Sequence, residues 1–322
     1  MKSRTSSSSY ISGLPGQDEV NISPTIAAMA AKTARHDSLQ RLFGVSPTTS
    51  EYQYPGKKGF SDIYDSEYNA FAQDQTKSGC QKSQYIIFIG VDEQTFRADL
   101  DEVSNKLLKK SYCDYIPARG LILVKMITEA HEQAYIGLDH FLVAKLTLMD
   151  PGLVRELLSP GHADIESNSH QKKADSSYRP KILPPGRSDH WPTVVVESAL
   201  SESRRKLAAD SRWWLSESAG DVKAALTIAV QKARREITIE KWELIKRPTR
   251  QDEDKRVCEV TQRVTVSQGA VDQPIRVTGG SLEIPFEYLF LRPAGLHEGD
   301  IVFDELDLKE LATMVWKLHA NI

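Results

Sequence analysis

The spacing of hydrophobic residues along this chain alternates between about 3.6 residues, typical of helices, and two, typical of strands. In the segment 128–146 apolar positions recur at intervals of three and four, and Thr128 can cap the first turn of this predicted helix. The segment 222–230 instead alternates apolar residues with smaller or polar ones, which predicts a strand. Helical spacing is found at 92–110, 128–146, 201–215 and 307–318, and strand patterns at 85–91, 119–126, 191–198, 222–230, 236–244, 257–266, 275–279 and 281–290.

The order of these elements indicates the class of fold. Strand, helix and strand follow one another from 191 to 230, which is typical of a partly parallel sheet covered by helices. The strands from 257 onward have the composition of an antiparallel extension. Asp307 and Glu310 have the spacing of a capping box at the start of the last helix. We therefore expect an α/β fold with a mixed sheet flanked by helices and an antiparallel C-terminal extension.

Residues 1–84 differ in composition from the rest of the chain. Ser, Thr, Gly, Pro and isolated charges dominate there, and only 23–42 shows plausible helical spacing. Segments of this composition bury too little apolar surface to offset the entropy lost on ordering. The pattern predicts a largely disordered N-terminal arm over 1–84 and a folded domain over 85–322.

Charge and cysteine content narrow the classes of function. The chain has 322 residues and a net charge of -3, so nucleic-acid binding would have to rest on a local basic patch. Its three cysteines are scattered, which favours a reducing compartment over a disulfide framework or a zinc ribbon. We find neither a signal peptide nor a membrane span in the sequence, and expect an intracellular protein, cytoplasmic or nuclear and not secreted. A serine-hydrolase elbow and a P-loop are also missing from the sequence, which disfavours both classes of enzyme.

Glu197 is chemically unusual because it lies inside the predicted buried strand 191–198. An ionised carboxylate in such a strand needs a metal ion, a cation or a raised pKa to be tolerated. Asp175 lies upstream in a basic loop. Two carboxylates at one edge of a sheet are a common way of holding a hard divalent cation. The two acids therefore predict a candidate metal site.

The order of a helix with Glu132, a loop with Asp175, a strand with Glu197, a helix and a strand resembles the PD-(D/E)XK, or restriction-endonuclease-like, superfamily. The chain also resembles a group of fungal proteins assigned to that fold, over the range 85–318. The segments that carry this second resemblance are MITEAHEQAY, KKADSSYRP, WPTVVVESALSES, LAADSRWWL, DVKAALTIAV and ITIEKWE. The resemblance implies a restriction-endonuclease-like fold and metal-dependent hydrolysis of phosphodiesters in nucleic acid.

For individual residues, the resemblance implies a metal site made of oxygen ligands. Asp175, Glu197 and Glu132 would bind Mg²⁺ or Mn²⁺, and the carbonyl oxygen of Ser198 would supply a further ligand.

The lysine of the superfamily motif is missing from its usual place. Position 199 is Ala, and Ala174 stands where the motif has proline. In some branches of the superfamily the lysine comes from the next helix, so Lys206 is the candidate here, with Arg205 beside it. Arg205 cannot act as a base, because its guanidinium stays protonated. The resemblance thus gives Lys206 the role of activating the nucleophile.

Each of the three acids also has a structural interpretation. Glu197 could form a buried ion pair with Lys206 or Lys223. Asp175 could hold a turn, and Glu132 could serve only the helix dipole. The chain would then be a catalytically degenerate module of nuclease fold that binds nucleic acid or protein.

Basic residues lie on both sides of the candidate acids in the sequence. If they cluster in space, they could hold a phosphate backbone, with binding that weakens as salt rises. If they do not, they are ordinary solvated surface charges. The candidates for contacts with nucleic acid are Lys172, Lys173, Arg179, Arg204 and Arg205.

Overall fold

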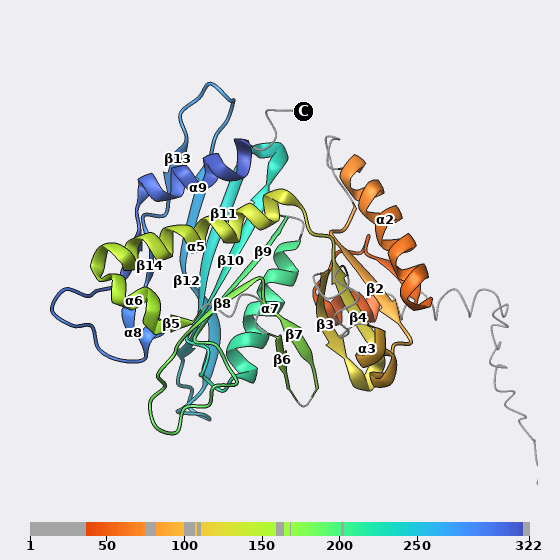
Figure 1. Cartoon of the computed structure of the whole chain (residues 1–322), viewed down its shortest axis with the longest axis horizontal. Coiled ribbons are helices and arrows are strands. Elements are labelled where there is room, and N and C mark those ends of the chain that lie inside the picture. Colours follow the sequence, from red (N-terminus) through yellow and green to blue (C-terminus); the bar gives the residue numbers. More distant parts are fainter. Residues whose placement is uncertain are drawn as a thin grey trace, which may run out of the picture. The chain divides into compact units, whose positions relative to one another are not determined.

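The structure of the chain is a computed structural model, and it describes residues 37–74, 82–99, 107, 111–158, 164–167, 169–200 and 203–317. The chain divides into two units, Met1–Ser38 and Leu39–Ile322. All of the elements named below belong to the second unit (Figure 1).

One sheet has six strands and is built mainly from the N-terminal part of this unit (Figure 1). Neighbouring strands pair antiparallel, except that β1 and β2 pair in parallel. Ile87 and Leu123, in two neighbouring strands inside this sheet, are fully buried. In spatial order the strands are β1 (Ser50–Gln53), β2 (Tyr85–Ile89), β4 (Leu121–Lys125), β3 (Tyr112–Ile116), β7 (Gln171–Lys173) and β6 (Asp164–Glu166).

A second sheet has seven strands. β9 and β10 pair in parallel, with the helix α7 (Arg204–Glu217) connecting them, and the other neighbours pair antiparallel. This mixed sheet confirms the predicted α/β fold. Of the strands predicted for the antiparallel extension, β12 and β13 continue this sheet, whereas the strand at Leu282–Ile284 belongs to a separate two-stranded sheet. In spatial order the strands are β13 (Arg276–Thr278), β12 (Arg256–Ser267), β11 (Glu236–Lys246), β10 (Ala224–Gln231), β9 (Val194–Leu200), β8 (Ser176–Pro180) and β5 (Leu157–Leu158).

Different helices cover the two faces of the seven-stranded sheet (Figure 1). Leu226 and Ile228 of β10 belong to the main hydrophobic core, together with residues of α5 (Glu129–Met149) and α9 (Glu305–Lys317). Ala225, which precedes Leu226 in the sequence, packs with residues of α7 on the opposite face. This division follows from the two-residue period of a strand. The central strands are therefore covered on both faces, which explains their continuous apolar runs.

Proline interrupts the strand predicted over 281–290. The chain forms a strand only up to Ile284, and a short helix begins directly after Pro285, whose φ of -55° suits a helix start. That part of the prediction was wrong. The remaining elements are α2 (Gly56–Asp74), α3 (Glu93–Asp99), α6 (Pro151–Glu156), α8 (Phe286–Phe290) and the antiparallel pair of β14 (Leu282–Ile284) and β15 (Ile301–Phe303).

Part of the segment predicted to be an N-terminal arm is folded. α2 lies within it, and Phe60 and Phe71 of this helix are fully buried in the main core. Ser, Asn and charged residues separate these aromatic side chains, so the composition of the segment concealed the helix. Residues 23–36 of the helix predicted over 23–42 lie outside the described residues.

The starts of two long helices test the capping predictions. Thr128 caps α5 as predicted, since its hydroxyl accepts a hydrogen bond from the backbone N–H of His131 at 3.3 Å. The predicted capping box of α9 is displaced by three residues. Asp304 Oδ1 accepts from Asp307 N at 3.1 Å, and Asp307 Oδ2 accepts from Asp304 N at 2.8 Å. Asp307 is thus the second acid of the box, and Glu310 is not part of it.

In the described part of the chain, no helix has both the length and the apolar character needed to cross a membrane. The intracellular location expected from the sequence stays a prediction.

Candidate functional site

Asp175 lies where the chain passes from β7 of the six-stranded sheet to β8 of the seven-stranded sheet. Its side chain is only 12% exposed. Both carboxylate oxygens accept hydrogen bonds from Lys125 Nζ at 2.8 Å, and Oδ2 also accepts from the backbone N–H of Ser198 at 2.7 Å. Burial disfavours the charged form of Asp175, but Lys125 and His131 outweigh it and hold its pKa below the usual value. Asp175 is therefore an ionised carboxylate inside the protein.

Glu197 lies in the middle of β9 and is buried. Its Oε1 accepts a hydrogen bond from Trp214 Nε1 at 2.7 Å, while Oε2 lies 3.9 Å from Lys125 Nζ. Burial, reinforced by the nearby carboxylates of Asp210 and Asp175, raises the pKa of Glu197 to about 8. At neutral pH, Glu197 is therefore mostly protonated, which relieves the cost of burying its charge.

Ser198 connects Asp175 to helix α5. Its backbone N–H binds Asp175, and its hydroxyl donates to the carbonyl oxygen of His131 at 3.2 Å. Its own carbonyl oxygen accepts from Lys125 Nζ at 3.2 Å. The Asp175 carboxylate, Glu197 Oε2 and the Ser198 carbonyl oxygen, which the sequence predicted as ligands, thus lie around one point.

Lys125 Nζ occupies that point. Lys125 is the last residue of β4 and is buried. Burial opposes the charge on its ammonium group, but Asp175 outweighs this effect and the pKa of Lys125 lies well above its usual value. Sequence reasoning missed this residue, because it precedes the candidate helix and is 50 positions from Asp175. A signal was present, since a lysine ending an apolar strand needs a buried partner or a route to solvent.

Helix α5 brings His131 into contact with Asp175. His131 Nε2 lies 3.1 Å from Asp175 Oδ2, which fits a hydrogen bond donated by the ring in the tautomer protonated at Nε2. Glu132 is half-buried at the next position. The pKa of Tyr135 is raised to about 12 by burial, by Asp175 and by Glu132, so both acids act electrostatically on this phenol.

Lys206 belongs to a separate group of four buried charges. Its Nζ lies 2.6 Å from Asp114 Oδ2 and also contacts Asp210. Lys172 lies 2.7 Å from Asp114 Oδ1 and contacts Asp210 as well. The charges of the two ammonium groups and the two carboxylates cancel. Their ion pairs connect β3 and β7 of the six-stranded sheet to α7.

The alternative ion pairs suggested for Glu197 are not formed. Lys206 is held in the group of four charges, and Lys223 Nζ donates to the carbonyl oxygen of Gly220 at 2.6 Å. The partners of Glu197 are Trp214 and, at a longer distance, Lys125.

The five basic candidates for nucleic-acid contacts differ in exposure. Lys172 is buried in its ion pairs, so its ammonium group does not reach solvent. Lys173 and Arg179 are half-buried, with Lys173 Nζ 5.2 Å from the centre of the Tyr112 ring, while Arg204 and Arg205 are exposed. A surface for phosphate would therefore rest on the last four.

The oxygen atoms around Lys125 Nζ suit a hard divalent cation only when the backbone carbonyl oxygen of Ser198 is counted with the two carboxylates. No group of three or more His, Cys, Asp or Glu side chains among the described residues is arranged to hold a metal ion. Two carboxylates and the Ser198 carbonyl oxygen are nevertheless the oxygen ligands that Mg²⁺ and Mn²⁺ prefer. A cavity of about 20 Å³, lined in part by Lys125, His131 and Asp175, lies beside the Asp175 carboxylate and has room for one water molecule or ion. The set fits a cation if the ammonium group of Lys125 moves aside.

Comparisons with known proteins show only distant similarity. Neither a protein-family model nor a curated protein matches the chain. The fold is similar to the crystal structure of a "putative nuclease belonging to DUF820" from Anabaena variabilis, with 11% sequence identity and a TM-score of 0.33. The match covers 62% of this chain and 90% of that one. A similarity this distant transfers no residue role or activity, so the resemblance to fungal proteins and the roles of the candidate residues stay predictions.

Proposed function

We propose that the chain is a divalent-metal-dependent phosphodiester hydrolase that acts on nucleic acid. The observation that supports this proposal most is the grouping of the Asp175 carboxylate, Glu197 Oε2 and the Ser198 carbonyl oxygen around the single point now held by Lys125 Nζ. Bound there, Mg²⁺ or Mn²⁺ would lower the pKa of a water molecule and neutralise charge on the scissile phosphate.

Asp175 and Glu197 would hold the cation, with Ser198 contributing its backbone oxygen. Asp175 is already ionised, whereas Glu197 must first lose its proton, because its pKa is about 8. Cation binding would therefore release a proton and become tighter as the pH rises. His131 would position Asp175 through the hydrogen bond from its ring.

Lys125 would take the part of the missing motif lysine. The cation would displace its ammonium group from between these oxygens, and Lys125, whose pKa is raised in the cation-free protein, would then lie beside the bound cation. A permanently charged ammonium group cannot accept a proton from water, so its contribution would be electrostatic: it would stabilise negative charge that builds up on the phosphate. Lys206, paired with Asp114 and Asp210, would keep a structural role.

Lys173, Arg179 and Arg205 would contact the phosphate backbone of the nucleic acid, since each is at least partly exposed, whereas Arg204 is paired with Glu236. Such contacts release counterions, so binding should weaken steeply with salt.

One observation favours a second candidate, a non-catalytic module that binds nucleic acid or protein. Lys125 gives two hydrogen bonds to Asp175, one to each oxygen, and Oδ2 also binds Ser198 N and His131 Nε2. A carboxylate satisfied in this way could be a permanent ion pair that has replaced a metal site.

Cleavage assays separate the two candidates. Single- and double-stranded DNA and RNA would be incubated with Mg²⁺, with Mn²⁺ and with a chelator. The hydrolase proposal expects cleavage that needs the cation and is lost in Asp175→Asn and Glu197→Gln, while Lys246→Gln, at an exposed pair with Asp254, cleaves like wild type. Cleavage that persists in both acid variants would exclude these two acids from the active site, and the absence of cleavage under every condition would favour the second candidate.

A further inference from the structure

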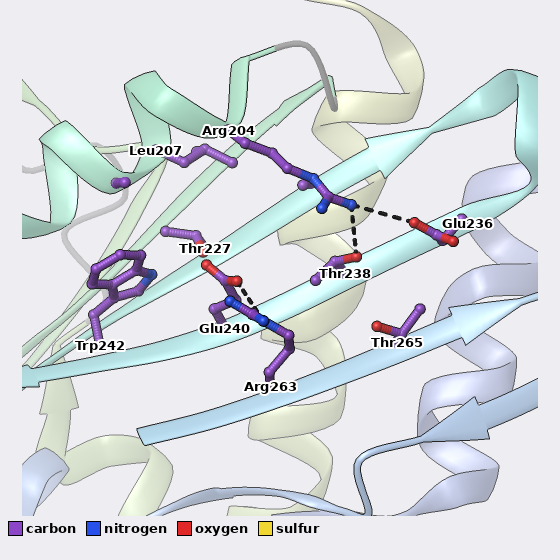
Figure 2. A pocket seen from close by; sticks show the side chains of 11 residues that line it. Arg204, Leu207, Thr227, Glu236, Thr238, Glu240, Trp242, Arg263 and Thr265 are labelled. Atoms are coloured by element: carbon purple, nitrogen blue, oxygen red, sulfur yellow. Dashed lines mark hydrogen bonds and ion pairs between the residues drawn. The ribbon is translucent and has the colours of Figure 1, made fainter. Parts of the chain in front are cut away.

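A second cavity, of about 400 Å³, lies between helix α7 and strands β10, β11 and β12. We call it the β11 groove, and the residues used below to define it are Arg204, Thr227, Glu236, Glu240, Trp242 and Arg263 (Figure 2). Its volume is within the range of sites for small organic ligands.

The groove exists because the two faces of this part of the sheet differ. Ile237 and Ile239 of β11 point into the main core, whereas Thr238 and Glu240 alternate with them and line the groove. The same alternation places Thr227 of β10 on the groove face. A polar sheet face that α7 covers only in part leaves an open hollow above β11.

Two ion pairs provide the charged groups of the groove. Arg263 Nε donates to Glu240 Oε1 at 2.7 Å, and Arg204 Nη2 lies 3.3 Å from Glu236 Oε1 and 3.2 Å from the hydroxyl of Thr238. Figure 2 shows both pairs at the groove, Arg204 coming from the helix and Arg263 from β12. Each pair places hydrogen-bond donors beside acceptors, and the four charges sum to zero.

Trp242 supplies an independent sign that the groove takes a ligand. It is 7% exposed, and its indole N–H is buried without a hydrogen-bond partner. Most buried donors in proteins are satisfied, and an unsatisfied one costs about 1–3 kcal/mol. In Figure 2 the indole nitrogen is on the side of the ring that faces Thr227 and Glu240. An acceptor bound in the groove would satisfy it.

We propose that the β11 groove binds a nucleoside through the hydrogen-bonding edge of its base. Such an edge carries donors beside acceptors, and arginine and glutamate are the side chains that pair with base acceptors and base amino groups respectively. Arg263 with Glu240 offers this combination, and the unpaired N–H of Trp242 offers one more donor.

Two other ligand classes fit less well. Inorganic phosphate would meet arginines that are already neutralised by Glu236 and Glu240. A saccharide usually stacks on an exposed aromatic face, but Trp242 is buried and the guanidinium group of Arg212 lies 5.5 Å from the centre of its ring. A neutral, planar ligand rich in donors and acceptors remains the best match.

The groove is close to the candidate acid but does not depend on it. Thr227 is the neighbour of Glu197 in the pairing of β9 with β10, so the groove begins one strand away. Nucleoside binding would be compatible with a hydrolase and with a non-catalytic module alike.

Calorimetric titration of the full chain with adenosine, guanosine, cytidine and uridine tests the proposal, with ribose and inorganic phosphate as comparison probes. We expect saturable binding of at least one nucleoside and none of ribose or phosphate. Glu240→Gln should weaken binding about tenfold or more, and Trp242→Phe should weaken it as well, because each removes a group that pairs with the base.

Arg263→Gln, at a side chain that is 62% exposed, provides a third variant that should fold normally and also bind more weakly. Glu259→Gln is the matched control and should bind like wild type. Glu259 lies on β12, as Arg263 does, and forms an exposed pair with Arg247. Absence of binding by all four nucleosides, equal binding of ribose, or wild-type affinity in the folded groove variants would each overturn the proposal. Loss of cleavage in Asp175→Asn with unchanged nucleoside binding would keep this site distinct from the proposed active site.

Discussion

Lys125 Nζ lies 2.8 Å from both carboxylate oxygens of Asp175, although the two residues are 50 positions apart. Lys125 ends a strand of the six-stranded sheet, and Asp175 directly precedes β8 of the seven-stranded sheet. The sequence predicted a metal cation at this carboxylate, and the structure has the ammonium group of Lys125 there instead. The contact also joins the end of β4 to the start of β8 inside the folded unit. The stability of the unit and the chemistry of the candidate site therefore depend on the same pair.

The first prediction concerns the stability of that pair. Lys125→Met leaves the Asp175 carboxylate buried without its main counter-charge, and should lower the free energy of unfolding by about 3–5 kcal/mol. Asp175→Asn added to Lys125→Met should recover part of the loss, because no buried charge then remains unpaired. Urea unfolding of both single variants and the double variant measures the coupling. Strictly additive losses would show that the two residues do not stabilise each other.

The second prediction concerns pH. Because the pKa of Glu197 is raised from 4.5 to about 8, the folded state holds a proton that the unfolded state releases between these values. Stability from this group is complete below pH 4.5 and is lost as the pH rises toward 8. Glu197→Gln keeps an acceptor for Trp214 and has no proton to lose, so its melting temperature should fall less than that of wild type over this interval. Parallel pH profiles of the two proteins would contradict the assignment.

The helix and strand pattern predicted much of the seven-stranded sheet, because its alternation depends on local spacing. Thr128 could be recognised as a cap, since its partner lies only three residues away. Glu197 and the Ser198 carbonyl could be placed at the site because their strand is continuous in sequence. Lys125 could not be placed at the site from the sequence, since its contact with Asp175 depends on how the two sheets pack against each other.

The partners of Lys206 could not be predicted from the sequence for the same reason. Its position one turn before Asp210 is visible in the sequence, but its other partner, Asp114, is 92 residues away. Long-range ion pairs leave no periodic signal, so a lysine near the motif in sequence was a reasonable candidate and the structure gives it other partners. The folded helix α2 escaped prediction for a related reason, because the burial of its aromatic residues depends on tertiary contacts such as that of Phe60 with Phe88 of β2.

The third prediction separates Lys206 from the candidate metal site. Lys206→Met should lower the free energy of unfolding by about 3–5 kcal/mol, because Asp114 and Asp210 lose a buried counter-charge. Mn²⁺ affinity measured well below the melting temperature should stay near the wild-type value. Lys246→Met, at a solvent-exposed pair, is the control for removing a lysine and should change neither quantity. A large fall in Mn²⁺ affinity with little change in stability would instead place Lys206 at the site.

The fourth prediction concerns nucleic-acid binding. The double variant Lys173→Gln and Arg205→Gln removes two cations that reach solvent, and should weaken the binding of every nucleic-acid sequence to a similar degree. The slope of log affinity against log salt should become shallower by about 0.9 for each duplex phosphate that the variant no longer neutralises. Filter binding at several salt concentrations gives that slope. A slope identical to that of wild type would mean that these residues do not bind phosphate.

Titration of the wild-type chain with Mn²⁺, followed by calorimetry at pH 8, tests the central claim most directly. If Asp175, Glu197 and the Ser198 carbonyl form a cation site, one Mn²⁺ binds saturably, with proton release, and neither Asp175→Asn nor Glu197→Gln binds it. Absence of a saturable site in the wild-type chain, or full binding in both variants, would contradict the account.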